Sequence, residues 1–188
     1  HLGVLAYHLV VRTSDSLDAG CPRNHFKTEA VLVAAVMERR VKPLMARHEV
    51  LLEAVASNPD PSVEELLGAW VRPLVELLNA EPERGQRYLT LMHRLQVGHH
   101  TGSVFLARWP DFAERFESLF KKALPHLSRA VLEFRVELAS ETILGSLAGA
   151  SNLSAPDLDN HVVALIDYLS GALEAPQTTR RRRKTPTK

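Results

Sequence analysis

Three histidines close together in the sequence are the first candidates for chemistry. His93, His99 and His100 carry imidazole groups, which are common ligands of transition metals. A zinc site needs three or four ligands in fixed geometry, usually with Cys or carboxylate partners. Gly98 interrupts the helical pattern between His93 and His100, so these two do not share one helix face. We expect no metal and no other cofactor, and histidines that face solvent or the polar rim of a pocket.

The sequence contains none of the common catalytic signatures. It has no Ser-His-Asp signature, no glycine-rich phosphate loop and no H-E-x-x-H pattern, and its carboxylates are scattered over polar helix faces. The single Cys21 excludes an intramolecular disulfide and fits a reducing compartment. We therefore expect a cytoplasmic protein that is not an enzyme.

A group of aromatic and apolar residues is a better candidate for a binding site. Aromatic and Met side chains on facing helices can surround an apolar ligand, because the rings are large and the thioether adapts its shape. An aromatic stripe at helical spacing is equally typical of an ordinary core, so both interpretations stay open. The candidate pocket residues are Trp70, Tyr88, Met92, Leu95, Phe105, Trp109, Phe112 and Phe116.

A basic run lies at the end of the sequence. Arg180, Arg181, Arg182, Arg183, Lys184 and Lys188 carry six positive charges. The whole chain of 188 residues has a net charge of +1, so the remainder is net negative and is not a broad polyanion-binding surface. The basic run could contact a phosphate backbone without sequence specificity, or it could be a solvated disordered tail.

These residues are positioned by segments that have helical periodicity almost throughout. Apolar residues recur at spacings of three and four, no segment alternates as a strand would, and no apolar run reaches the ~20 residues of a membrane span. We expect a soluble all-α protein with about seven helices. The clearest segments are Thr28 to about Ser57, Ser62 to Leu78, Gln86 to Val97, Val104 to Leu124, Ser128 to Gly149 and Ser154 to about Leu173.

Several residues predict where these helices begin, end or bend. Ser62 with Glu65 predicts a capping box, and Ser128 and Ser154 are placed to cap two later helices. The stretch from Asn79 to Gly85 is expected to be a loop. Two prolines lie within helical patterns. Pro43 is expected to kink its helix or split it in two, and Pro73 is expected to bend its helix.

The stretch Asn24–Arg40, NHFKTEAVLVAAVMERR, resembles a junction found in TetR-family repressors. There, a Y-x-H-F-x-[ST]-K-x-x-L segment ends the DNA-binding head and opens the long helix into the ligand-binding body. His25-Phe26, Thr28 and Leu32 fall on this template. The resemblance implies that a few residues at this junction contact DNA phosphates. The positions that can be carried over are His25, Lys27 and Thr28.

The sequence departs from this template at the head. Pro22 and Arg23 stand where an aromatic is expected, and Glu29 stands where the family has a phosphate-contacting Lys. A head of this type needs about three helices with a tight glycine-containing turn before the recognition helix. Residues 1–23 do not supply them, so we expect an incomplete head.

The resemblance extends over about three quarters of the chain. Val41–Leu44 looks like a Pro-Leu element that follows the linking helix, and Leu119–Leu127 looks like the segment before the dimer helices. It implies a TetR-like regulatory domain with an internal pocket for an apolar effector, in which the last two helices form a four-helix bundle with a second subunit. The expected division is an incomplete head at 1–27, an effector-binding and dimerisation domain at 28–174, and a basic disordered tail at 175–188.

The expected helix from Ser128 to Gly149 is apolar on two sides and must therefore be covered on two sides. One cover is the protein's own core, and the other is expected to be a partner subunit. A monomer would leave either one stripe or its opposite face, which carries Phe134 and Leu138, in water. The alternative is that the chain's own helices cover both sides. The interface residues we expect are Leu132, Val136, Ile143, Leu147, Leu158, Val162, Leu165 and Leu169.

The sequence thus predicts a homodimeric, ligand-responsive transcriptional regulator of the TetR repressor type. Operator DNA is an expected partner if the head is complete in the full-length protein, and a small apolar effector is the other; a membrane is not. The alternative is an all-α dimeric interaction protein that does not bind DNA.

Overall fold

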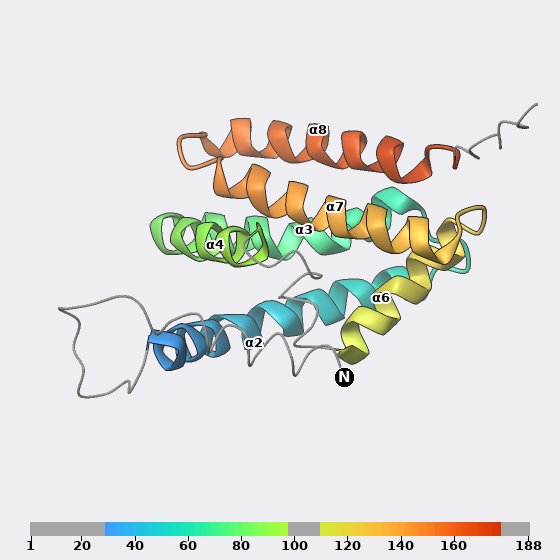
Figure 1. Ribbon diagram of the computed structural model, residues 1–188. Coiled ribbons are helices and arrows are strands. Elements are labelled where there is room, and N and C mark those ends of the chain that lie inside the picture. The colour runs from blue at the N-terminus through green and yellow to red at the C-terminus, as the bar shows by residue number, and fades with distance from the viewer. Residues whose placement is uncertain (1–28, 98–109, 178–188) are drawn as a thin grey trace, which may run out of the picture.

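The computed structural model describes residues 29–97 and 110–177, and these fold into six helices without a strand (Figure 1). The prediction of an all-α fold is therefore confirmed. Residues 1–28, 98–109 and 178–188 lie outside the described part. The helices are α2 (Glu29–Ala56), α3 (Val63–Ala80), α4 (Pro82–Val97), α6 (Pro110–Ala123), α7 (Arg129–Ala148) and α8 (Ala155–Glu174).

The centre of the fold is α3, which contacts α2, α4, α6 and α8. Ten of its 18 residues are buried, because neighbours cover it on several sides. Its start is fixed by the capping box that the sequence predicts. The Glu65 N–H donates to the Ser62 hydroxyl at 3.1 Å, and the Ser62 N–H donates to the Glu65 carboxylate at 2.8 Å.

Two antiparallel helices, α7 and α8, form a hairpin along one side of the domain (Figure 1). Polar contacts fix this hairpin at both ends. At the α8 C-terminus, Arg135 donates to the carbonyl oxygens of Leu173 at 2.7 Å and Ala175 at 2.5 Å. Near the turn, the Ser146 hydroxyl lies 2.7 Å from the His161 ring. The hairpin therefore presents one defined outer surface.

The predicted loop from Asn79 to Gly85 is wrong. α4 begins at Pro82, and a single residue, Glu81, connects it to α3. Proline suits the first turn of a helix, where its missing N–H has no partner to lose. A Cβ at Gly85 would lie 3.0 Å from the Leu77 carbonyl oxygen, so glycine permits the close approach that this short connection requires.

Neither internal proline splits its helix, although a split is one of the two outcomes expected at Pro43. α2 continues through Pro43 and α3 through Pro73. Pro43 is exposed, so the carbonyl that loses its helical partner can bond to water. Pro73 is buried, and the apolar packing of α3 on four neighbouring helices offsets the lost hydrogen bond.

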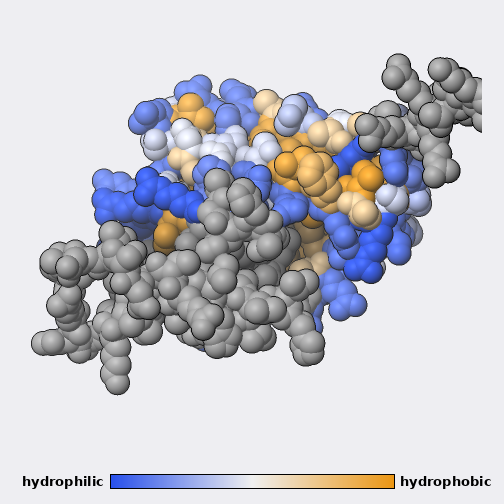
Figure 2. Space-filling view, in the orientation of Figure 1, coloured by the Kyte–Doolittle hydropathy of each residue, from blue (hydrophilic) through white to orange (hydrophobic). Residues whose placement is uncertain are grey.

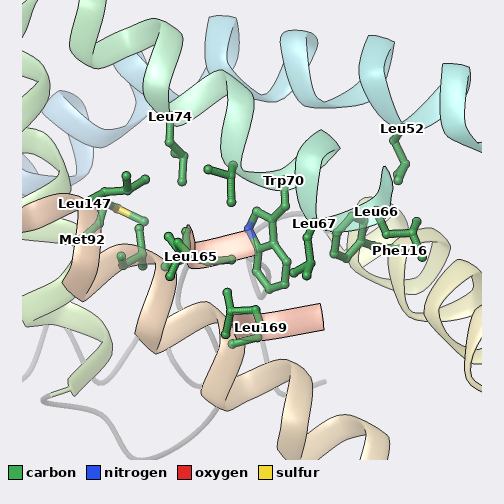
Figure 3. Packing of buried hydrophobic residues seen from close by; sticks show 14 of the residues in the cluster. Leu52, Leu66, Leu67, Trp70, Leu74, Met92, Phe116, Leu147, Leu165 and Leu169 are labelled. Atoms are coloured by element: carbon green, nitrogen blue, oxygen red, sulfur yellow. The ribbon is translucent and has the colours of Figure 1, made fainter. Parts of the chain in front are cut away.

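The core gathers around Trp70 of α3 (Figure 3). Leu165 and Leu169 of α8 pack beside its indole ring, and Phe116 of α6 meets it edge-on with ring centroids 4.9 Å apart. All four side chains are buried. Side chains from α3, α6 and α8 therefore meet at this residue.

Candidate functional site

The structure separates the predicted pocket residues into two groups. Phe112 and Phe116 of α6 stack with centroids 5.8 Å apart, and Phe116 meets Phe120 edge-on at 4.9 Å. Both phenylalanines are buried, and neither lines the core cavity or the surface groove described below. They form an aromatic ladder that fixes α6 against Trp70. Phe105 and Trp109, and the side chain of Leu95, lie outside what the structure describes.

The other three predicted residues, Trp70, Tyr88 and Met92, line one small cavity in the core. The cavity has a volume of about 10 Å³, which is about the space one water molecule needs. Its walls come from α2, α3, α4 and α7. The remaining lining residues are Leu44, Leu74, Leu89, Ser140 and Leu144.

A buried polar pair lies beside this cavity. The Ser140 hydroxyl of α7 donates to Oε1 of Gln96 on α4 at 3.4 Å, and both residues are almost fully buried. The Nε2 amide group of Gln96 has no hydrogen-bond partner among the described residues. A buried amide without a partner costs about 1–3 kcal/mol, so this donor is available to an acceptor placed next to it.

Sequence reasoning missed this pair, although one signal was present. Gln96 follows Met92 by four residues and therefore lies on the same face of α4. A glutamine in an otherwise apolar helix face indicates a buried polar contact. Ser140 gave no such signal, because only the packing of α7 on α4 brings it to Gln96.

α2 is tied to α3 next to the cavity by two polar contacts. Buried His48 has Nδ1 2.8 Å from the Leu44 carbonyl oxygen and Nε2 2.9 Å from the Trp70 carbonyl oxygen. Burial lowers the pKa of His48, although both carbonyl oxygens act in the opposite direction. On the surface, Arg47 binds the Glu76 carboxylate through two 2.8 Å hydrogen bonds, which lowers the pKa of Glu76.

Most of the predicted interface residues are covered by the chain itself. Val136 and Val162 are half-buried, and the other six are buried. They pack inward because α7 lies on α4 and α8 lies on α3. The six buried residues are Leu132, Ile143, Leu147, Leu158, Leu165 and Leu169.

The outer side of the hairpin carries the exposed apolar residues instead. Phe134 is 60% exposed and Leu138 44% on α7, while Val163 is 60% and Tyr168 67% on α8. Figure 2 shows hydrophobic side chains at the surface over this part of the molecule. These four residues are called the outer face below.

Comparison with known proteins identifies the family. A family model described as "Tetracyclin repressor-like, C-terminal domain" matches residues 68–175, which is more than half of the chain. The chain belongs to this family. The matched region runs from within α3 to the end of α8, and it includes the outer face and the polar pair. No curated protein and no solved structure matches the chain.

As a member of the tetracyclin repressor-like family, the protein is a TetR-type transcriptional regulator, as the sequence predicts. Regulators of this family are in general not enzymes. The predicted DNA contacts His25, Lys27 and Thr28, together with His99 and His100, lie outside the described residues. Among those that are described, no group of three His, Cys, Asp or Glu residues could hold a metal ion. No helix in this part of the chain is long and apolar enough to cross a membrane.

Proposed function

We propose that this TetR-type regulator is a ligand-responsive repressor whose body binds a small apolar effector and forms a homodimer. The observation that carries the proposal is the polar pair Ser140–Gln96 beside the cavity at Trp70. A mostly apolar site with a few convergent polar groups is the usual composition of a small-molecule pocket. The free amide of Gln96 favours an apolar effector that carries one hydrogen-bond acceptor.

The cavity must open to accept such an effector, because 10 Å³ holds no more than about one water molecule. Met92 is the side chain best suited to move, since its unbranched thioether has several rotatable bonds. Its neighbours Trp70 and Tyr88 have rigid rings, so they move only together with the helices that carry them. The ligand thus selects a conformation in which α4 and α7 are slightly further apart.

Ligand binding would be communicated to α2, the helix that resembles the family's link to the DNA-binding head. Leu44 of α2 lines the cavity, and His48 of the same helix contacts the Trp70 carbonyl oxygen. Displacement of Trp70 therefore moves two anchors of α2 together. In a dimer, this movement changes the spacing of two heads that must fit successive major grooves of operator DNA.

The dimer proposal rests on the outer face rather than on the eight residues chosen from sequence. Four large apolar side chains on two adjoining helices are exposed, and exposed apolar surface of this kind favours contact with a partner. Paired with the same hairpin of a second subunit, they would give an isologous four-helix bundle. The division into 1–27, 28–174 and 175–188 stays a prediction; α8 ends at Glu174.

The effector proposal can be tested by thermal-shift measurements with matched pairs of compounds. Each pair consists of an apolar molecule with one carbonyl or hydroxyl acceptor and its hydrocarbon analogue. The wild type should be stabilised more by the acceptor-bearing member. In Gln96→Leu, this preference should disappear while the chain stays folded, because leucine has a similar volume. If no compound raises the melting temperature of the wild type, the aromatic residues are core only.

DNA binding can be tested by gel-shift titration at several salt concentrations. The chain as printed should show at most weak, salt-sensitive binding, because the sequence of residues 1–23 lacks the glycine-containing turn pattern expected of a complete head. Specific, salt-resistant binding by this chain would contradict the incomplete head. Absence of binding by a chain extended with a full head would favour the alternative, a dimeric interaction protein.

A further inference from the structure

A second and much larger hollow lies on the surface, where the end of α3 and the outer side of α4 meet the α7–α8 turn. It has a volume of about 720 Å³ and shares no lining residue with the core cavity. This volume is within the ~300–1,000 Å³ range of small-molecule sites. The lining residues are Leu78, Asn79, Pro82, Glu83, Gln86, Arg87, Thr90, Leu91, Arg94, Ala150, Ser151, Leu153, Ala155 and Leu158.

The floor of this groove is apolar and fixed in place. Leu78, Ala150 and Leu158 are buried, and Leu91 is half-buried. Gln86 of α4 donates to the carbonyl oxygens at the end of α7, at 3.3 Å for Leu147 and also to Ala148. The glutamine therefore joins two walls of the groove and uses its own donors for this purpose. An entering hydrocarbon would meet a preformed surface that needs no polar contact.

One wall of the groove is cationic. Arg87 and Arg94 are seven residues apart on α4, so they lie about 10 Å apart along one helix face. Arg94 makes no hydrogen bond or ion pair with any described residue, and Arg87 has only an exposed 3.5 Å contact with Glu83. Glu83 is the one carboxylate among the lining residues, so the wall has a net positive charge. Surface ion pairs of this kind are weak, and Arg87 can exchange it for a ligand.

We propose that this groove binds an amphipathic anion, an aliphatic chain that ends in a carboxylate. The chain lies along Leu78, Leu91 and Leu158, under the partly exposed Leu153. The carboxylate pairs with Arg94 and, by displacing Glu83, with Arg87, since a planar guanidinium matches the geometry of a carboxylate. Because α3, α4 and the α7–α8 turn all contribute, an occupied groove holds α4 and α8 together. The site is independent of the proposed effector cavity.

The test measures octanoate binding to the full chain by calorimetry, below the critical micelle concentration, with octanol and acetate as probes of each half. Octanoate should bind, and octanol and acetate should bind more weakly. The double variant Arg87→Gln/Arg94→Gln should weaken octanoate binding about three- to tenfold, as expected for partly solvated charge-assisted contacts. It should leave octanol binding unchanged. Leu153→Glu places a carboxylate over the groove and should abolish octanoate binding.

Arg84→Gln is the matched control, because Arg84 is exposed on α4, pairs with Glu81 at 3.9 Å and does not line the groove. Its affinity for octanoate should equal that of the wild type. The proposal is overturned if the wild type does not bind octanoate, if octanol binds as tightly, or if both groove variants bind octanoate like the wild type. In that last case the ligand occupies another site, and Gln96→Leu would show whether this is the core cavity.

Discussion

The inner and outer sides of the α7–α8 hairpin both carry large apolar side chains but have different surroundings. Inward, Leu132, Ile143 and Leu147 are buried against neighbouring helices of the same chain. Outward, Phe134 and Leu138 are just as apolar and lie in water. Hydrophobicity alone therefore does not distinguish a core stripe from an interface stripe. The difference is made by which side α4 and α3 occupy, and only the outer side is left for a partner.

The largest expected effect is the difference in stability between truncating a side chain on the inner side of the hairpin and truncating one on the outer face. Ile143→Ala should lower the free energy of unfolding by about 2–5 kcal/mol, since it removes buried contacts and leaves a cavity. Leu138→Ala on the outer face should change the stability of the monomer by about 0.5 kcal/mol or less. Urea denaturation at a protein concentration low enough to dissociate a dimer measures both. Equal losses at the two positions would show that the hairpin packs differently.

Charge on the outer face tests the dimer directly. In the double variant Phe134→Asp/Tyr168→Asp, two carboxylates from each subunit would have to be desolvated in the interface, which costs several kcal/mol. We expect light scattering to give a monomer for this variant and a dimer for the wild type, with unchanged helix content by circular dichroism. Lys121→Asp/Lys122→Asp on α6 is the matched control and should stay dimeric. A wild type that is monomeric at tens of micromolar would refute the dimer.

A polar contact at the edge of the hairpin should have an intermediate effect. Arg135→Met keeps most of the side-chain length but leaves the carbonyl oxygens of Leu173 and Ala175 without their charged donor. The free energy of unfolding should fall by about 1–2 kcal/mol. The loss is no larger because water can reach part of this site and bond to the carbonyl oxygens. Arg129→Met is the control, since Arg129 is on the same helix and makes only exposed ion pairs, with Glu133 of α7 and Glu117 of α6. If thermal unfolding shows equal losses for both, the Arg135 contact does not hold the hairpin together.

The smallest expected effect concerns two glycines of the hairpin, one that packs against a neighbouring helix and one that faces open space. A Cβ at Gly145 of α7 would lie 2.9 Å from the His93 ring of α4, whereas a Cβ at Gly171 of α8 would have no atom within 4 Å. Gly171→Ala should stabilise the protein by about 0.5–1 kcal/mol through helix propensity. Gly145→Ala should instead destabilise the protein by about 1 kcal/mol, because the contact of the new Cβ with His93 outweighs the gain in helix propensity. In a His93→Ala background, Gly145→Ala should become stabilising; a double-mutant cycle without coupling would contradict the close approach.

Much of the helical layout follows from local signals in the sequence. Ser62 with Glu65 predicts the start of α3, and Ser154 predicts the start of α8; both caps are present. Ser128 stands at the predicted start of α7, but its side chain makes no capping hydrogen bond. A loop was wrongly predicted at the start of α4 because proline and glycine are typical of loops. At Pro82 and Gly85 they instead fit a helix start and a close approach to α3, and this depends on the position of a neighbouring helix.

The sequence by itself determined an all-α protein, the helix caps at Ser62 and Ser154, and a resemblance to the family that the comparison identifies, because these depend on residues near one another in the chain. It also showed that α7 is apolar on two sides. Only the tertiary structure decided which side is core, that Ser140 meets Gln96, and that Arg87 and Arg94 border an open groove. Each of these depends on residues far apart in the sequence, whose meeting is set by how whole helices pack and not by the spacing along any one of them.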